Sequence, residues 1–492
     1  MLRPTALLSL ALALTLGSDA VAQSAVIDTL AIRAHTRFLS HDMLRGRGTA
    51  SPGERLAALY IASQCVALGL QAANGDYMQS VPLELAHLRS TARLLVAGPA
   101  LRSEFRYPAD FTPNVGRKGT LVDFAGRAAY VGGADDIRAG LGALELDGKV
   151  AVTLGPLRGA PADTLAARGA AGMIHLIGEP EAYELYVQSR GTSRMYHRDA
   201  DLPSSSLPKV PSVIAGPRVA QALLAGTPVV RGAKMLPQPL PWTAEVHMEF
   251  ETEAVAATNV ACVLPGADPQ ARDTAIAFAA HYDHLGVGVP DAAGDSVFNG
   301  FSDNAAGVAM LLAIGQALAN TSSEPMRHST LLLFFSAEEK GLLGSDYYVE
   351  RPMWPLERTL AVINLDAGAP PAPPVSWQLA GVDSTGLGAV AIGVAQRRGW
   401  RVTTSRPRPI SDFYPFTRRG VPALLIIPGP DPYEGLTADS SKALRGRWDQ
   451  YHKPGDEWAD DFPFAGLARY AEFAYLIAQQ ADRGAIPVRA RR

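Results

Sequence analysis

From about Thr258 onward the chain carries short, nearly continuous apolar runs, and several of them end in acidic or imidazole side chains. The runs read NVACVLPG, TAIAFAA, TLLLFF, LAVINL and PALLIIPG. Strands that are apolar on both faces belong in a largely parallel sheet covered by helices. Segments with helical spacing alternate with them, at residues 304–320 and 463–482. The pattern predicts an α/β fold in three layers, with a central, mostly parallel mixed sheet between helices.

The chain has 492 residues, which is enough for two domains. Between Gly119 and about Phe250, short strand-like pieces alternate with Gly, Pro and Asp turns, which indicates a smaller, β-rich α/β domain. Within it, residues 149–178 read as strand, helix and strand. We therefore expect a leader at 1–22, the first part of the larger domain at 23–118, an inserted domain at 119–250, and the rest of the larger domain at 251–492.

The first 22 residues resemble a secretory signal peptide, with Arg3, an apolar run and the small residues Ala20 and Ala22. We expect a secreted or periplasmic protein after removal of this segment near Ala22. No later stretch reaches about 18 uninterrupted apolar residues, so no membrane span is expected. The 45 Lys and Arg against 48 Asp and Glu give a net charge of −3, which argues against nucleic acid as a partner. The oligomeric state is left open.

Cys65 and Cys262 are the only cysteines, so at most one disulfide bridge can form within the chain. Export would permit such a bridge. Both residues lie in apolar patterns, one in an expected helix and one in an expected strand, so two buried thiols fit as well. Neither has a neighbouring His in sequence, which argues against a nucleophilic role.

Five segments carry side chains that suit metal ions, and three of them directly follow apolar strands. In an open α/β sheet the ligand site lies outside the carboxyl ends of the strands. Two imidazoles and several carboxylates, with no thiolate, suit zinc with positions left for water. A shared carboxylate such as Asp303 would bridge two metal ions about 3.5–4 Å apart. The candidates are His281 and Asp283, Asp303, Glu338 and Glu339, Asp366, and His452.

Neighbouring candidates are expected to have different roles. In an extended segment His281 and Asp283 lie on one face, so Asp283 would accept a hydrogen bond from the far ring nitrogen and orient the imidazole. If the strand continues through Glu338 and Glu339, one binds metal and the other faces the water as general base. His284, without a comparable setting, is assigned to the surface or to packing.

In order, HYDHLG, NGFSDNAAG, FFSAEEKGLLGS, INLDA and DQYHKPGDE resemble the motifs of the secreted dizinc aminopeptidase family. Bacterial leucyl aminopeptidases, glutamate carboxypeptidases, glutaminyl cyclases and the transferrin receptor ectodomain are relatives within that family. The resemblance covers residues 258–482. The segment FLSHDMLRGRGTASPGE resembles the part that precedes the inserted domain in bacterial members, and the insert resembles a protease-associated domain by texture more than by motif.

The resemblance implies two Zn²⁺ ions, with His281 and Asp366 on one, Glu339 and His452 on the other, and Asp303 bridging. It makes Glu338 the general base that takes a proton from the water between the ions. It also implies a cis peptide between Asp303 and Asn304. In SDFYPFTRRGVPAL, three residues either line the substrate pocket or belong to a turn before the next strand, namely Ser411, Asp412 and Phe416.

These observations predict a secreted zinc exopeptidase, and first an aminopeptidase that removes amino-terminal residues from peptides. A carboxypeptidase or a glutaminyl-cyclase-like enzyme on the same fold is an alternative, although the cyclases lack a complete second zinc set. A third reading is an inactive binding protein of the transferrin-receptor type, whose signature would be lost ligands. Ser302 and Ala367 depart from common family residues, but neither departure removes a ligand.

Overall fold

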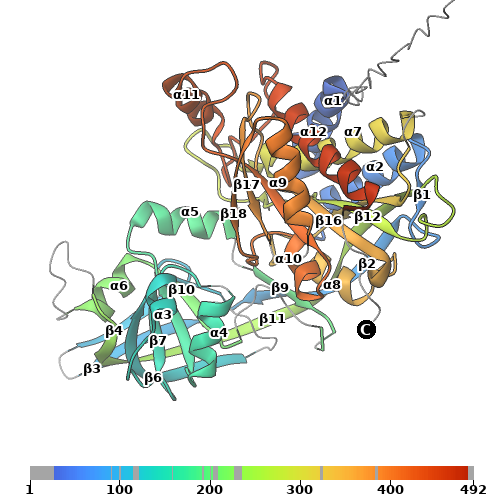
Figure 1. The fold of residues 1–492 in the computed structure, drawn as a ribbon. Helices are drawn as coiled ribbons and strands as arrows, with labels where there is room; N and C mark the ends of the chain where they lie inside the picture. The colour runs from blue at the N-terminus through green and yellow to red at the C-terminus, as the bar shows by residue number, and fades with distance from the viewer. Residues whose placement is uncertain are drawn as a thin grey trace, which may run out of the picture.

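One strand of 27 residues, β11 (Gln238–Leu264), runs through both halves of the fold. In the computed structural model it starts in a smaller lobe and ends in a larger one (Figure 1). The expected domain boundary between residues 250 and 251 therefore falls inside a continuous strand. The structure describes residues 27–89, 91–98, 101–114, 121–157, 159–190, 193–199, 201–202, 209–225, 235–321, 325–382 and 386–485, so the expected signal peptide at 1–22 lies outside the described residues.

The larger lobe is built on a mixed sheet whose central strands are parallel. β15, β12, β16 and β19 run parallel side by side, while β11 pairs antiparallel with β15, and β17 pairs antiparallel with β19. This arrangement confirms the predicted mostly parallel central sheet. In spatial order the strands are β9 (Ser193–His197), β2 (Met78–Leu88), β11, β15 (Ser329–Phe335), β12 (Ala275–His281), β16 (Thr359–Leu365), β19 (Ala423–Pro428), β17 (Ser376–Ala380) and β18 (Arg401–Ser405), and β1 (Gln71–Ala72) pairs with the end of β11.

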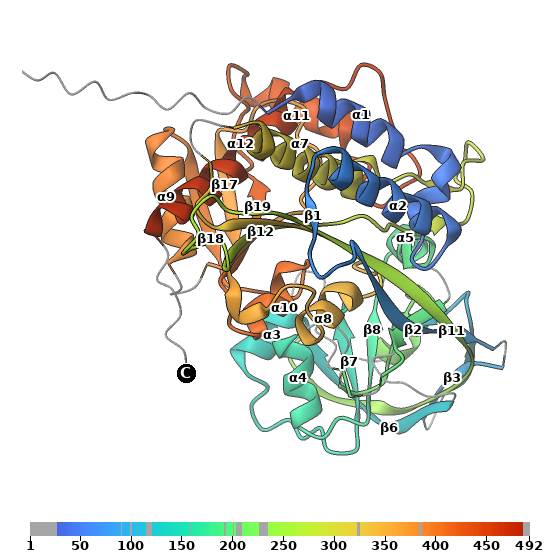
Figure 2. The same cartoon turned by 90° about the vertical axis from the view of Figure 1, so that its right-hand side faces the viewer.

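Helices cover both faces of this sheet, as expected for three layers (Figure 2). One face carries α1 (Thr29–Leu39), α2 (Pro52–Ala67), α7 (Ala306–Asn320), α9 (Leu387–Arg397) and α12 (Ala465–Gln480), and the other carries α8 (Leu343–Glu350) and α10 (Phe413–Arg418). Local sequence signals define where these helices begin. Ser51 is the N-cap of α2: its hydroxyl accepts the amide of Glu54, and Pro52 occupies the first turn.

The segment Phe301–Asn320, which contains α7, is long and apolar enough to cross a membrane, and no other described helix is. However, 89% of its apolar window is buried inside the protein. Its apolar side chains pack in the same core as those of α1, α2 and α12. The segment is therefore explained as the central helix of the core.

The smaller lobe has its own sheet and confirms the predicted strand–helix–strand unit. β7 (Val150–Leu154) and β8 (Gly172–Leu176) are parallel neighbours joined through α4 (Ala160–Ala167). The sheet continues through β4 (Leu101–Arg106), β3 (Arg93–Gly98), β11, β6 (Leu121–Gly132), β7, β8, β10 (Ser212–Ala215) and β5 (Phe111–Pro113), with α3 (Ala134–Ala139), α5 (Pro180–Arg190) and α6 (Pro217–Leu224) as its other helices. Because β3, β4 and β5 precede residue 119, this sheet starts earlier in the chain than the expected insert.

The two cysteines form a disulfide that ties α2 to β11, 197 residues apart in sequence. Both residues are fully buried in the core of the larger lobe. The sequence left open whether they pair or stay as buried thiols, and the structure has them paired.

Candidate metal centre

The carboxyl ends of three neighbouring strands bring the predicted ligands to one edge of the larger sheet. β15, β12 and β16 are adjacent and parallel, so their ends coincide. His281 is the last residue of β12, Asp366 directly follows β16, and the Glu338–Glu339 pair lies in the turn after β15. The two remaining candidates, Asp303 and His452, reach this edge from loops.

All five predicted ligands converge on two positions that share Asp303. At the first position, Nε2 of His281 lies 3.1 Å from Oδ1 of Asp303 and 3.1 Å from Oδ1 of Asp366. At the second, Nε2 of His452 lies 3.0 Å from Oδ2 of Asp303 and 3.3 Å from Oε1 of Glu339. The two oxygens of Asp303 therefore face two different histidines, which is the placement that a bridging carboxylate requires.

His284 belongs to this centre, which corrects its assignment to packing or to the surface. It is fully buried, and its Nδ1 lies 2.9 Å from Oε1 of Glu339 and 3.7 Å from Oδ2 of Asp303. His284, Asp303 and Glu339 form a group of donor atoms compact enough for one ion, as do His281, Asp303 and Asp366. The sequence signal that could have indicated this role is the position of His284, three residues beyond His281 in the loop after β12.

The residues fit a zinc pair. Every donor is an imidazole nitrogen or a carboxylate oxygen, which are ligands that zinc accepts. The Nε2 atoms of His281 and His452 each lie within 3.3 Å of two of these carboxylates. Burial alone would raise the pKa values of Asp303 and Glu339, but the neighbouring histidines lower both, so the two carboxylates are ionised and ready to bind a cation.

The side chains of Glu338 and Glu339 point to different parts of the site, although β15 ends before it reaches them. β15 ends at Phe335, and the pair lies in a turn. Glu339 faces the two histidines of the second position, whereas Glu338 lines a pocket together with His281 and other site residues. Burial raises the pKa of Glu338 well above its usual value; the charge of His281 lowers it, and the neighbouring carboxylates raise it further. A carboxylate with this high proton affinity suits a general base.

Asp283 acts on the geometry of the site through its main chain as well as its side chain. The ring Nδ1 of His281 lies 3.0 Å from the main-chain oxygen of Asp283, whereas the expected carboxylate partner is 3.7 Å away. The carboxylate instead accepts hydrogen bonds from Oγ1 of Thr49 at 2.6 Å and from the amide of Glu338 at 3.1 Å. Asp283 thus fixes both the imidazole and the turn that carries Glu338.

The loop that carries Asp303 is anchored by Asp456, four residues after His452. The implied cis peptide between Asp303 and Asn304 is present. The buried carboxylate of Asp456 accepts the amides of Ser302 at 2.9 Å and Asp303 at 3.2 Å. These bonds hold the loop that carries Asp303 against the loop that carries His452, so the two ligands keep their relative position.

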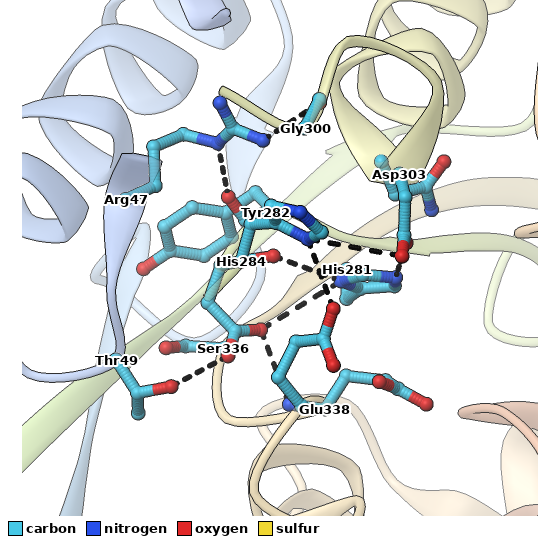
Figure 3. A network of polar contacts seen from close by, with 12 residues as sticks. Arg47, Thr49, His281, Tyr282, His284, Gly300, Asp303, Ser336 and Glu338 are labelled. Carbon is cyan, nitrogen blue, oxygen red and sulfur yellow. Dashed lines mark hydrogen bonds and ion pairs between the residues drawn. The ribbon is translucent and has the colours of Figure 1, made fainter. Parts of the chain in front are cut away.

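A fully buried cation, Arg47, lies behind the centre (Figure 3). Its Nε donates to the main-chain oxygen of Tyr282 at 2.6 Å, and its Nη2 donates to that of Gly300 at 3.0 Å. Its Nη1 donates to the oxygens of Asn299, at 2.7 Å, and Leu39. One side chain therefore joins the turn after His281 to the loop before Asp303. No pattern in the sequence marks Arg47 as part of the site.

Replacing Arg47 with Met is expected to lower the free energy of unfolding by about 3 kcal/mol or more. The change leaves four buried carbonyl oxygens without their donor, and each unsatisfied group costs about 1–3 kcal/mol before the structure relaxes. Urea unfolding of both proteins measures the difference. Arg45→Met is the matched control, because Arg45 is exposed and shares the left-handed backbone region. Equal stability of the two variants would contradict the anchoring role.

Comparison with known proteins bears on what this centre does. Residues 259–476 match the family model described as "Peptidase family M28". This chain carries an M28 peptidase domain. Comparison with curated proteins finds no match. The matched residues of the M28 domain include all five predicted ligands and Glu338, but not residues 119–250, so the likeness of the insert to a protease-associated domain stays a prediction.

Solved structures share the fold of the M28 domain and of the rest of the chain. An aminopeptidase from Aneurinibacillus sp. strain AM-1 has a TM-score of 0.54 at 19% identity, covering 93% of this chain and 95% of the other. A zinc aminopeptidase from Bacillus subtilis has a TM-score of 0.51 at 18% identity, covering 92% and 95%. At these identities the likeness shows the fold, and it confirms the predicted α/β architecture with its central sheet.

A pocket of about 400 Å³ opens beside the metal centre of the M28 domain. None of Ser411, Asp412 and Phe416 lines it, although the preceding residue, Ile410, does. Ser411 is buried and donates its hydroxyl to Asp366, so it holds a ligand in place. Asp412 is also buried, which raises its pKa to about 7. Phe416 packs under the sheet against Phe335. Of the two readings that the sequence left open, the structure thus favours a supporting place for these residues over a place in the pocket wall.

Proposed function

We propose that this chain is a zinc-dependent exopeptidase that removes amino-terminal residues from peptides. The single observation that carries the proposal is the shared Asp303: its two oxygens face two donor groups, and it lines one pocket together with Glu338. A peptidase domain acts on peptides, and this arrangement places a proton acceptor beside two potential cation positions. No ligand or base expected from the sequence is missing, which argues against an inactive binding protein.

The side chains divide the chemistry as follows. A bound zinc pair would polarise the peptide carbonyl and lower the pKa of the attacking water. Glu338 accepts a proton from that water at its carboxylate and delivers it to the departing amine. Asp283 accepts the amide of Glu338 and so keeps the base at the pocket wall. The main-chain oxygen of Asp283 orients the ring of His281, whose Nε2 faces the first metal position.

Two considerations favour the amino terminus of the peptide as the end that is cleaved. Glu338 belongs to neither compact donor group, so it leaves a negative charge at this end of the pocket when the other carboxylates hold zinc, and such a charge attracts the α-ammonium group of a peptide. In addition, both solved structures compared above are of aminopeptidases. A carboxypeptidase or a cyclase on the same fold would use the same metal centre with a different substrate orientation.

The proposed specificity predicts that the zinc-loaded protein hydrolyses short peptides with a free amino terminus and leaves their acetylated counterparts intact. Chromatography of the products of each pair measures which bond is cut, and removal of metal with a chelator should abolish the cleavage. Release of the carboxy-terminal residue from acetylated peptides would identify a carboxypeptidase instead. Cyclisation of an amino-terminal Gln without hydrolysis would identify a cyclase.

We also propose that the protein acts in the periplasm or outside the cell. The signal-like segment ending near Ala22 supports this location, and so does the buried bridge between Cys65 and Cys262, because disulfides persist in oxidising compartments. Cell fractionation followed by amino-terminal sequencing tests the proposal. A cytoplasmic protein that retains residues 1–22 would contradict it.

A further inference from the structure

The pocket beside the metal centre carries opposite charges on its walls. His281, Asp303, Glu338 and Asp366 belong to the metal centre. Most of the remaining wall comes from the segment after β16, from the end of β19 at Pro428 with Gly429 and Tyr433 beyond it, and from α11 (Ala438–Trp448) with the residues that follow it. Among the described residues that line the pocket, Arg445 of α11 is the one Lys or Arg. The pocket therefore combines an acidic centre with a single cation.

Arg445 is held in place by neutral groups. Its Nη2 donates to the main-chain oxygens of Gly429, at 3.4 Å, and Asp431. Its guanidinium carbon lies 4.3 Å from the ring centroid of Tyr433, which also lines the pocket. A guanidinium fixed by a ring and by carbonyl oxygens keeps its full positive charge, and its other nitrogens keep donors to offer.

No carboxylate of the described residues forms an ion pair with Arg445. The nearby Asp431 pairs with Arg401 at 2.6 Å, and Glu434 pairs with Arg469 at 3.1 Å. Asp449 lines the same pocket four residues further along but makes no ion pair with Arg445. By contrast, Arg447 on the same helix pairs with Asp461. Arg445 is thus a partly buried cation, facing a pocket, whose charge no carboxylate of the described chain balances.

We infer that Arg445 binds a carboxylate of the substrate. This inference rests on the proposed function and narrows its substrate class. A peptide bound with its amino terminus at the metal centre would offer a negative group to Arg445, and guanidinium groups bind carboxylates with paired, charge-assisted hydrogen bonds. The pocket volume of about 400 Å³ lies in the range of small-molecule sites and suits a short zwitterionic peptide.

The carboxylate can come from two sources: an acidic side chain of the substrate, or the free carboxy terminus of a dipeptide. Two matched pairs of peptides distinguish them. Leu-Ala and Leu-Ala-amide differ only in the terminal carboxylate, while Glu-Ala-amide and Gln-Ala-amide differ only in the side-chain carboxylate. The ratio of kcat/KM within each pair, measured with the zinc-loaded full chain, reports the preference for the charged member.

We expect the wild-type protein to prefer the charged member of one pair by at least about tenfold, which is the effect of one charge-assisted contact. Arg445→Met should remove that preference mainly through KM, because the contact binds the ground state as well as the transition state. Arg445→Lys should keep part of it. The matched control is Lys442→Met, which removes an exposed cation of α11 that does not line the pocket. It should leave both ratios unchanged.

The outcomes separate this inference from the proposed function. Hydrolysis of all four peptides with no charge preference in either pair would overturn the role of Arg445 and leave the aminopeptidase intact. Equal losses of kcat/KM for both members of each pair in Arg445→Met would reduce Arg445 to a structural residue. No hydrolysis of any of the four peptides by the wild-type protein would contradict the proposed function and this substrate class together.

Discussion

Replacing Glu338 with Gln is expected to reduce kcat by at least about 100-fold while both metal ions remain bound. The range for the loss of a general base is about 10²–10⁴. Gln has nearly the same shape as Glu but cannot accept the proton from water. Glu338 belongs to neither compact donor group, because its turn directs it into the pocket and directs Glu339 to the histidines. Steady-state kinetics and metal analysis of the same preparation measure both effects.

The matched control is Glu339→Gln, one residue further along the same turn. Glu339 accepts from His284 at 2.9 Å and lies 3.3 Å from His452, so its replacement should lower the metal content. Glu338→Gln should therefore lose activity and keep its metal ions, whereas Glu339→Gln should lose both activity and metal. Unchanged turnover in Glu338→Gln would rule out its role as the base. Loss of metal in that variant would place Glu338 among the ligands.

The sequence could predict His281, Glu339 and Asp366 as ligands because each lies at the end of, or shortly after, an apolar run that forms a parallel strand. Such strands end at one edge of the sheet, so a residue just beyond a strand is already placed to within a few ångströms. His281 and Asp366 are of this kind, and they meet as predicted. The Glu338–Glu339 pair shows the limit of this reasoning. Strand alternation predicts that the two side chains point to opposite sides, but β15 ends before them and the turn after β15 separates them instead.

What the sequence could not predict are contacts between segments that are distant in the chain and carry no pattern of their own. Arg47 lies more than 200 residues before the carbonyl groups that it binds, and those acceptors are main-chain atoms with no side-chain signature. The sequence left open whether Ser411 lines the substrate pocket or belongs to a turn. Its hydroxyl donates to Asp366, because β16 and the segment before α10 are close in space. Such supporting contacts depend on the packing of the whole lobe.

The two histidines near Glu339 make the second metal position a point where sequence and structure differ. The family resemblance implies His452 as a ligand, and the structure places His284 close to the same two carboxylates, Asp303 and Glu339. The two imidazoles use different atoms: His452 presents Nε2 to both Asp303 and Glu339, whereas His284 lies within hydrogen-bond distance of Glu339 only, through Nδ1. The shared geometry of His452 fits a ligand. The single close contact of His284 fits a residue that orients Glu339.

His452→Ala is therefore expected to leave one metal ion per chain, and His284→Ala to keep two ions with weaker binding. The loss of an outer partner of a ligand reduces metal affinity by about 10–100-fold, so excess zinc should restore activity to His284→Ala but not to His452→Ala. Metal analysis after dialysis against buffered zinc measures the stoichiometry, and activity against free zinc measures the affinity. Because both substitutions remove an imidazole beside the same carboxylate, a difference between them reflects position. One ion in His284→Ala and two in His452→Ala would reverse the two roles.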